Sequence, residues 1–402
     1  MITKFDSLYA GHVDMDNIGY AGTAVNDRVF DNDHLASVYS KTDAIAKTMD
    51  ANGYDTFWLA EHHFQPEGYE CIPNVLMSAV HLAHITERLN IGCGFNIAPM
   101  WHPLRLAEDY ATADILTGGR VIFGVGRGYH SREIESFGSP LFDQEGNRDL
   151  FEEQVDIIFK AFNKDSFSHH GKNYTIPPSV PYRGYELEEI TLVPRPLRLP
   201  VECWQPIQSA TPRGLDFMAK HGIKGIIGGG VAEGGAMHRV VEAFRDAYAR
   251  TGVDLELGGN LSFGYHFYLA DSKEKAIREA AELFEENLKM FGPLRLVRAL
   301  SEEQIDAMSD PQRASNFDLP RIEGAVEAGG FLCGTPEEVA AQLKRVEEAY
   351  PGLDRISVSQ PVGTAEAIIT EQLQWFAEEV MPAFKGSASA RESELEAVPG
   401  DD

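Results

Sequence analysis

Apolar runs with the spacing of β-strands alternate with helical patterns along nearly the whole chain. The expected strands cover residues 5–10, 54–60, 90–98, 120–125, 201–205, 223–228, 261–269 and 355–359. Amphipathic helical segments fill most of the intervals between them. Eight strands that alternate with helices predict a parallel sheet closed into a (β/α)8 TIM barrel. An open, doubly wound sheet is the alternative, but no GxGxxG motif opens the first strand–helix turn.

Two segments interrupt this alternation, and we expect both to be insertions in one barrel domain that spans residues 1–385. Residues 166–200 are rich in proline, tyrosine and glycine, which predicts a hairpin followed by an extended connection. Residues 293–330 have weak periodicity and many turn signals, which favours a lid or an interface over plain surface chain. The last residues, 386–402, are small and acidic, and we expect a disordered tail.

The charge balance excludes two classes of partner. The chain has 62 acidic and 35 basic residues, a formal net charge of −27. Such a polyanion is repelled by phosphate backbones and anionic lipids, so neither nucleic acid nor a membrane is an expected partner. No signal-peptide pattern and no apolar run of the ~20 residues needed to span a membrane is present. The four cysteines form no CxxC pair. These features predict a soluble cytoplasmic protein without a zinc or disulfide scaffold.

The segment Glu61-His62-His63-Phe64 follows the second expected strand. In a barrel, this carboxyl end of the strands holds the active site. Adjacent side chains on a strand point to opposite faces, so only one of the two histidines can face the barrel mouth. The chain has no HxH on the first strand to complete a metal site, so we expect no metal. The residues alone leave open whether these histidines are structural or whether one is catalytic.

Two further segments have the composition of a phosphate site. In Gly126-Arg127-Gly128-Tyr129, glycines let a ligand approach the backbone, and the guanidinium group matches phosphate oxygens. The other, Gln208-Ser209-Ala210-Thr211, opens a helix after the fifth strand. Its hydroxyl groups are either helix N-caps or, with the free amides of the helix start, phosphate ligands.

The order and spacing of several blocks resemble the bacterial luciferase-like family of flavin-dependent monooxygenases, over about residues 5–384. The matching blocks are residues 53–64, 88–92, 102–105, 107–109, 114, 119–124, 127–128 and 334–338.

This resemblance implies an FMN that lies over the barrel mouth. Its phosphate would be held by Arg127, by the backbone of Gly128 and Tyr129, and by Gln208, Ser209 and Thr211. The spacing after Thr211 differs from luciferase by a small insertion. The isoalloxazine ring would rest on Gly94, Phe95 and Asn96, where the family often has a non-prolyl cis peptide bond.

The resemblance also implies a catalytic histidine. His62 matches the family histidine that exchanges a proton near the oxygen adduct of flavin C4a, and a histidine pKa suits transfer in either direction. We expect Glu61 and His63 to brace it. One departure concerns Gly126, which stands where luciferase has a reactive cysteine, so light emission from a fatty aldehyde is not implied.

The activity that follows is that of a two-component monooxygenase. A separate NAD(P)H:flavin reductase would supply reduced FMN, and a C4a-(hydro)peroxyflavin formed with O2 would oxidise a small organic substrate. The reaction would be hydroxylation, Baeyer–Villiger insertion or heteroatom oxidation. The family also implies a homodimer or higher homo-oligomer. Two alternatives remain at this point: an F420-dependent hydride-transfer enzyme and a non-catalytic flavin-binding protein of luciferase descent.

Overall fold

Eight parallel strands form a closed barrel in the computed structural model, which describes residues 1–229, 235–297 and 300–384. Each strand pairs with the next in the order β1, β2, β3, β5, β10, β11, β12 and β14, and β14 pairs back to β1. The predicted (β/α)8 barrel is therefore confirmed. The strand bounds are Lys4–Tyr9, Thr56–Leu59, Asn90–Cys93, Val121–Gly126, Cys203–Pro206, Lys224–Gly228, Leu261–Leu269 and Arg355–Ser359.

The strands are buried because helices cover the barrel outside and side chains fill the inside. All four residues of β2 are buried, and the largest fully buried side chains of the described residues are all Phe, Tyr or Trp. This two-sided burial explains why the strands read as continuous apolar runs. The third strand departs from the expected single run of residues 90–98. It breaks after Cys93, and a short strand β4 (Asn96–Ile97) pairs separately with β5.

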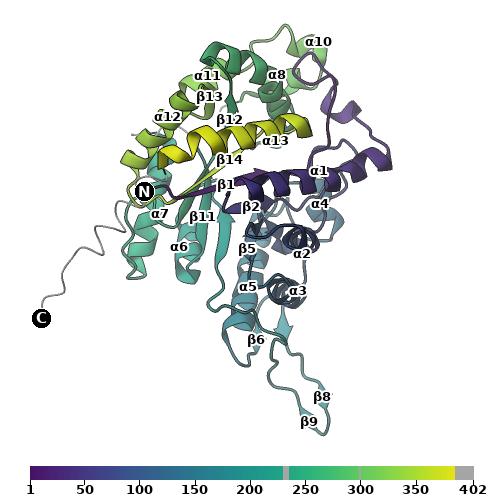
Figure 1. Cartoon of the computed structure of the whole chain (residues 1–402). Helices are drawn as coiled ribbons and strands as arrows, with labels where there is room; N and C mark the ends of the chain where they lie inside the picture. Colours follow the sequence, from purple (N-terminus) through teal and green to yellow (C-terminus); the bar gives the residue numbers. More distant parts are fainter. Residues whose placement is uncertain (230–234, 298–299, 385–402) are drawn as a thin grey trace, which may run out of the picture.

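Helices cover the barrel (Figure 1), and several of them begin at a capping side chain. Asn74 caps α2 and Asp143 caps α5, each by accepting a hydrogen bond from a backbone amide of the first turn. The helices that follow the barrel strands are α1 (Asn32–Ala51), α2 (Val75–Ile85), α3 (Pro103–Leu116), α4 (Ser131–Ser136), α5 (Gln144–Asn163), α6 (Pro212–His221), α7 (Ala236–Arg250), α8 (Lys273–Phe291), α12 (Pro336–Ala349) and α13 (Glu366–Trp375). In the described part of the chain, no helix has the length and apolar character to cross a membrane.

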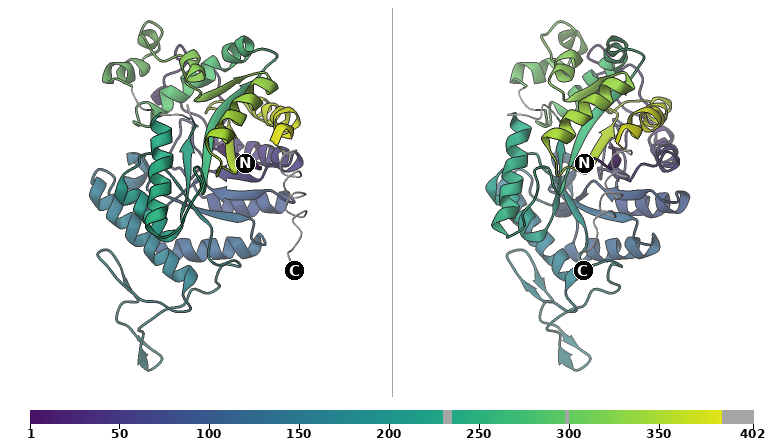
Figure 2. Two further views of the ribbon diagram at one scale, coloured as in Figure 1. Left: turned by 90° about the vertical axis from the view of Figure 1, so that its left-hand side faces the viewer. Right: turned by 60° about the vertical axis from the view of Figure 1, so that its left-hand side comes forward.

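The two insertions lie at opposite ends of the molecule (Figures 1 and 2). Residues 166–200 contain two small antiparallel pairs, β6 (His169–His170) with β7 (Thr175–Ile176) and β8 (Pro181–Tyr182) with β9 (Tyr185–Glu186). The latter pair projects from the body as an arm. The described residues of 293–330 form the short helices α9 (Glu302–Met308), α10 (Pro311–Ala314) and α11 (Ile322–Glu327).

The structure adds one strand that the sequence did not predict. Residues Phe331–Gly334 form β13, which pairs with the outer part of β12 and stands outside the closed barrel. β12 has nine residues, so it is long enough to pair with β14 near its start and with β13 near its end. The expected disordered tail at 386–402 lies outside the described residues.

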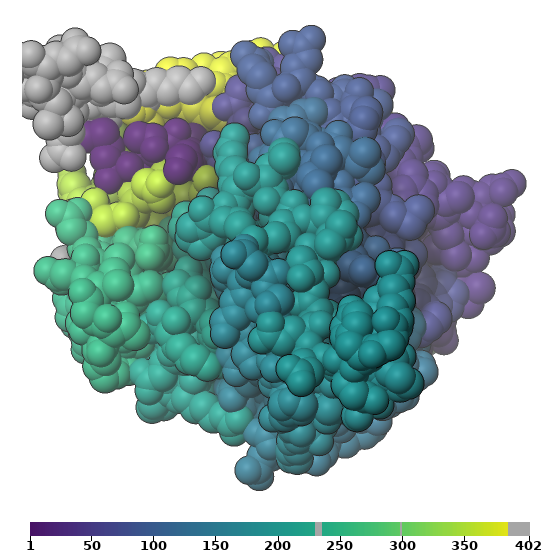
Figure 3. Space-filling view, turned by 90° about the horizontal axis from the view of Figure 1, so that it is seen from below, coloured from purple at the N-terminus to yellow at the C-terminus, as the bar shows by residue number. Residues whose placement is uncertain are grey.

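The two ends of the described chain meet where the barrel closes. Lys4 on β1 is in register with Arg355 on β14, and the terminal amine of Met1 donates a hydrogen bond to the Pro351 carbonyl at 3.1 Å. Figure 3 shows the first residues of the chain between segments of its C-terminal part. Closure of the barrel therefore depends on pairing between residues about as far apart in sequence as this chain permits.

Gly124 is a site where the barrel has no room for a side chain. A Cβ atom there would lie 1.9 Å from the Cys93 carbonyl oxygen and 2.9 Å from the Phe95 ring. We expect Gly124→Ala to lower the free energy of unfolding by about 3 kcal/mol, measured by urea denaturation. Gly324→Ala on α11 is the matched control, because a Cβ atom at that position would meet no atom within 4 Å. Equal effects of the two substitutions would contradict this packing argument.

Candidate functional site

A cavity of about 680 Å³ lies at the carboxyl ends of the barrel strands. Residues at the ends of β1, β2, β3, β5, β10, β12 and β14 line it. Leu294 to Val297, which follow α8, form part of its wall, so the beginning of the second insertion borders the cavity. This is the end of a (β/α)8 barrel at which active sites are built.

The structure brings nine of the ten predicted site residues to this cavity. They are His62, Gly94, Phe95, Arg127, Gly128, Tyr129, Gln208, Ser209 and Thr211. Asn96 is the exception. It is fully buried, and its side-chain amide donates a hydrogen bond to the Gly124 carbonyl at 2.9 Å, so it ties β4 to β5.

The end of the third strand forms a floor beside the histidine segment. The peptide bond between Gly94 and Phe95 is cis, at the position that the resemblance indicated. Glu61 holds the residues that follow: its carboxylate accepts hydrogen bonds from the Ile97 amide at 2.7 Å and from Trp101 Nε1 at 2.8 Å. Glu61 therefore supports the floor of the cavity, whereas the sequence had suggested that it braces His62.

His62 lies between two carboxylates. Its Nδ1 is 3.2 Å from both oxygens of Glu133, and its Nε2 is 3.2 Å from Glu70 Oε1. Tyr129 links the same atoms, since its hydroxyl lies 3.0 Å from His62 Nε2 and donates to Glu70 Oε1 at 2.7 Å. Glu70 and Glu133 are the braces, and the expectation that Glu61 and His63 serve this purpose was wrong.

His63 points in another direction. Its Nε2 lies 3.3 Å from Glu61 Oε1, and its ring packs edge-on against Phe137 at 4.9 Å between centroids. It borders a second cavity of about 130 Å³, whereas His62 borders the large one. The alternation of side chains along the chain thus separates the two histidines, and only His62 faces the barrel mouth.

The carboxylates determine the charge of His62. Burial alone would lower the pKa of this imidazole, but the negative charges of Glu70 and Glu133 outweigh burial and raise the pKa above its ordinary value. Burial would raise the pKa of Glu70, but His62 and His130 lower it to about 2. The network therefore stabilises a proton on His62, next to the cavity.

This charge pairing predicts how stability depends on pH. Because the pKa of Glu70 is lowered, this carboxylate stabilises the folded state at pH values above 4.5, its ordinary pKa. This stabilisation is lost as the pH falls toward about 2. Because the pKa of His62 is raised, the protonated imidazole stabilises the folded state at pH values below 6.5, its ordinary pKa. This stabilisation is lost as the pH rises through the pKa of His62 in the folded protein. We expect the free energy of unfolding of the wild type, relative to Glu70→Gln, to peak between these limits. Urea denaturation across this pH range checks the result, and parallel curves would contradict it.

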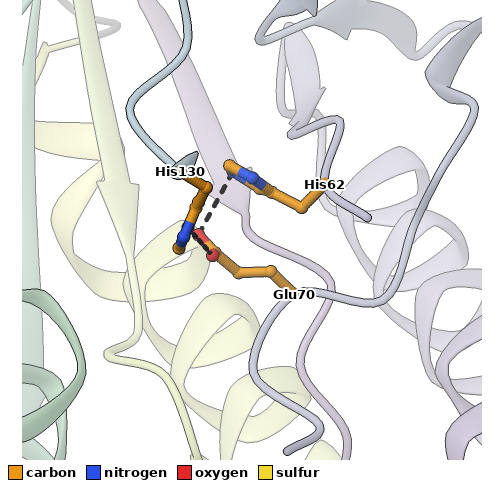
Figure 4. A group of neighbouring side chains, drawn as sticks. All are labelled: His62, Glu70 and His130. Carbon is orange, nitrogen blue, oxygen red and sulfur yellow. Dashed lines mark hydrogen bonds and ion pairs between the residues drawn. The ribbon is translucent and has the colours of Figure 1, made fainter. Parts of the chain in front are cut away.

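His62, Glu70 and His130 also form a group whose ligand atoms lie within 4.8 Å of one another (Figure 4). The figure shows both histidines directed at the Glu70 carboxylate. Hydrogen bonds already account for this arrangement: Glu70 Oε2 lies 2.7 Å from His130 Nε2 and accepts from Gln65 Nε2 at 2.9 Å. We therefore interpret the group as a hydrogen-bond network, and the expectation of no metal stays a prediction.

Another part of the cavity wall is basic. Arg127 Nε donates to Asn147 Oδ1 at 2.8 Å, which fixes the guanidinium group at the cavity wall. Arg148 lines the same wall. Burial lowers the pKa of Arg127, and the charges of Arg148 and Arg213 lower it further, while the Glu152 carboxylate partly opposes them. Guanidinium groups that destabilise one another in this way form a favourable site for an anion.

The start of α6 completes a cradle for such an anion. Thr211 precedes α6, but its side chain makes no capping hydrogen bond, contrary to the simplest structural interpretation. A Cβ at Gly214 would lie 3.0 Å from Thr211 Oγ1 and 3.3 Å from Arg148 Nη1, so glycine keeps this space open. The free amides and positive dipole end of α6 face the same region. These residues fit the phosphate of a flavin mononucleotide.

Four residues of the site were not predicted from the sequence. They are Glu70, His130, Glu133 and Arg148. His130 directly follows the Gly126–Tyr129 turn, so its position after a strand was an available signal. Glu70 lies in an irregular loop, and Arg148 lies on a helix, where a polar residue usually indicates only an exposed face.

The family model for luciferase-like monooxygenases matches residues 21–351. The chain therefore belongs to the luciferase-like monooxygenase family, and at the level of the family the predicted flavin-dependent monooxygenase is confirmed. One relative is the oxygenase component of a flavin-dependent trigonelline monooxygenase from Acinetobacter baylyi, 26% identical over 90% of this chain and 94% of the relative. Another, the uncharacterised protein y4vJ of Sinorhizobium fredii, is 31% identical over 145 residues, which is 36% of this chain and 40% of y4vJ.

Solved structures share the fold at low sequence identity. The oxygenating constituent of 3,6-diketocamphane monooxygenase from Pseudomonas putida, in complex with FMN, aligns with a TM-score of 0.68 at 18% identity and covers 95% of this chain and 99% of that one. An F420-dependent secondary alcohol dehydrogenase aligns with a TM-score of 0.62 at 15% identity and covers 95% of this chain and 99% of that one. A homodimer and a cytoplasmic location stay predictions.

Proposed function

We propose that this protein is the oxygenase component of a two-component monooxygenase that uses reduced FMN and O2 to oxidise a small organic substrate. The observation that carries the proposal is a single cavity with a basic cradle at one end and the His62 network beside it. When bound, the flavin supplies the chemistry that activates O2 and inserts one oxygen atom into the substrate.

We assign a different role to each group of residues around the cavity, according to its position. Arg127, Arg148 and Thr211 hold the phosphate, with the start of α6 as a further source of hydrogen-bond donors. The Gly94–Phe95 segment supports the ring system. His62 holds a proton at Nε2, where Tyr129 and Glu70 position it.

Exclusion of water is the function that we assign to the second insertion. Its first residues, Leu294 to Val297, are part of the cavity wall and are mostly apolar. A reactive oxygen species in such a site survives longer when bulk water is kept out. We propose that the segment 293–330 acts as a lid.

A separate reductase is the expected source of reduced flavin. The A. baylyi relative is described as an oxygenase component, which supports a two-component system here too. The sequence itself has no GxGxxG turn for a nicotinamide cofactor after its first strand. We therefore propose an NAD(P)H:flavin reductase as the partner.

The test compares two reduced cofactors. We expect the protein to bind reduced FMN, measured anaerobically by fluorescence titration, and to change the rate of O2 consumption relative to a protein-free control with the same flavin reductase and NADH, because free reduced FMN itself reacts with O2. The second candidate is F420-dependent hydride transfer, supported by the shared fold of the alcohol dehydrogenase. Turnover with F420, together with no binding of reduced FMN and no effect on O2 consumption relative to the control, would overturn the proposal in favour of that activity.

A further inference from the structure

A second polar region lies across the barrel mouth from the basic cradle. Gln360 directly follows β14, and Arg127 directly follows β5. In the closed order of eight strands, β14 and β5 are four places apart and therefore face one another. We use the name polar subsite for the cavity residues His12, His266, Asn287, Ser359 and Gln360, which come from β12, β14, α8 and the loop after β1.

Buried amide atoms in the polar subsite lack partners. Gln360 is only 8% exposed. Neither its Nε2 nor its Oε1 has a hydrogen-bond partner among the described residues. Within the same described ranges, Asn287 Oδ1 is also buried and unpartnered. Buried polar atoms of folded proteins almost always have partners, so one donor and two acceptors here indicate a ligand.

The polar subsite carries no charge at neutral pH. Burial lowers the pKa of His266 to about 4. Burial, together with the neighbouring Lys41 ammonium group, lowers the pKa of His12 well below its ordinary value. Arg295 also borders the cavity, but its guanidinium group is exposed and paired with Glu302. A charged ligand group would find no counter-charge among these residues.

We propose that the polar subsite binds the substrate through a neutral group with an N–H donor beside a C=O acceptor, as in a lactam or a carboxamide. This inference rests on the proposed function, because it assigns the other end of the cavity to FMN. An amide edge pairs with Gln360 through two hydrogen bonds, and in a primary carboxamide the second N–H is left to donate to Asn287 Oδ1. A carboxylate offers only acceptors and would face two carbonyl oxygens. A hydrocarbon would leave all three atoms unpaired.

Apolar neighbours limit the remainder of the substrate. Leu8, Phe291 and Val362 line the cavity beside the polar subsite. A substrate that meets both features has one amide-like edge on an otherwise apolar body. Small cyclic compounds of equal ring size separate the contribution of the edge from that of the body.

The first experiment measures binding of three such probes, 2-piperidone, cyclohexanone and cyclohexanecarboxylate, by ligand-observed NMR. It uses the full chain, both free of flavin and loaded with FMN. We expect 2-piperidone to bind about tenfold more tightly than either other probe. Equal affinities, or tighter binding of the carboxylate, would overturn the proposal.

The second experiment identifies the residue responsible. Gln360→Leu should reduce the affinity for 2-piperidone about tenfold and that for cyclohexanone by less, because the ketone can make only one of the two hydrogen bonds to Gln360. Gln374→Leu, the same change on the exposed face of α13, is the control and should alter neither value. Thermal denaturation checks that both variants fold.

FMN affinity separates the possible failures. If Gln360→Leu weakens FMN binding instead of lactam binding, Gln360 holds the flavin and the substrate assignment is wrong. If the lactam preference depends on Gln360 but no FMN binds to any variant, the proposed function fails and the polar subsite stands. A lactam preference that Gln360→Leu does not change would also overturn the assignment.

Discussion

Replacement of His62 by alanine is expected to lower the turnover number by about 100- to 10,000-fold while the affinity for reduced FMN stays within about twofold. The reason is the position of the imidazole: it borders the cavity and is held at both nitrogens by carboxylates that favour its protonated form. A general acid in this environment contributes to the chemical step and not to binding of the phosphate, which Arg127 and Arg148 are proposed to hold. Steady-state turnover and anaerobic fluorescence titration measure the two quantities.

The neighbouring histidine provides the matched control. His63→Ala removes an imidazole next in sequence that borders only the small second cavity. We expect it to keep most of the turnover. Were His62→Ala to turn over at the wild-type rate, the catalytic assignment would fail, and a non-catalytic flavin-binding protein would become the better interpretation.

Apolar periodicity was sufficient to predict the barrel because most residues of the strands are buried. All eight predicted strand regions overlap a barrel strand of the structure. The expected strand 90–98 was too long, because the chain breaks after Cys93 and β4 pairs separately with β5. β13 was missed because it is a short strand that depends on pairing with the outer end of β12.

The positions of site residues at strand ends were also predictable, but their contacts were not. His62 and Arg127 follow strands, and the barrel topology places all such residues at one mouth. The partners of His62 come from two other segments: Glu133 lies on α4, and Glu70 lies in the loop before α2. No periodic pattern encodes a contact between residues 71 positions apart, as for His62 and Glu133. Proximity in sequence had instead suggested Glu61, which turns toward Ile97 and Trp101.

Arg127→Ala is the change expected to affect flavin binding most. Loss of a guanidinium group that makes charge-assisted hydrogen bonds to phosphate costs about 2–3 kcal/mol, which raises the dissociation constant for reduced FMN by about 100-fold. The substitution should also relieve the mutual repulsion with Arg148 that lowers the pKa of Arg127. The fold should lose about 1–3 kcal/mol of stability, because Asn147 is fully buried and its Oδ1 loses the Arg127 donor. Anaerobic fluorescence titration measures the affinity.

Riboflavin makes this prediction specific to the phosphate. It carries the same ring system without the phosphate, so Arg127→Ala should change riboflavin affinity by no more than about twofold if the guanidinium group binds the phosphate alone. Arg148→Ala should behave in the same way, and the double variant should lose less than the sum of the two single losses in free energy, because each arginine is destabilised by the other. Equal losses of FMN and riboflavin affinity would place Arg127 against the ring and would remove the basic end of the cavity as the phosphate site.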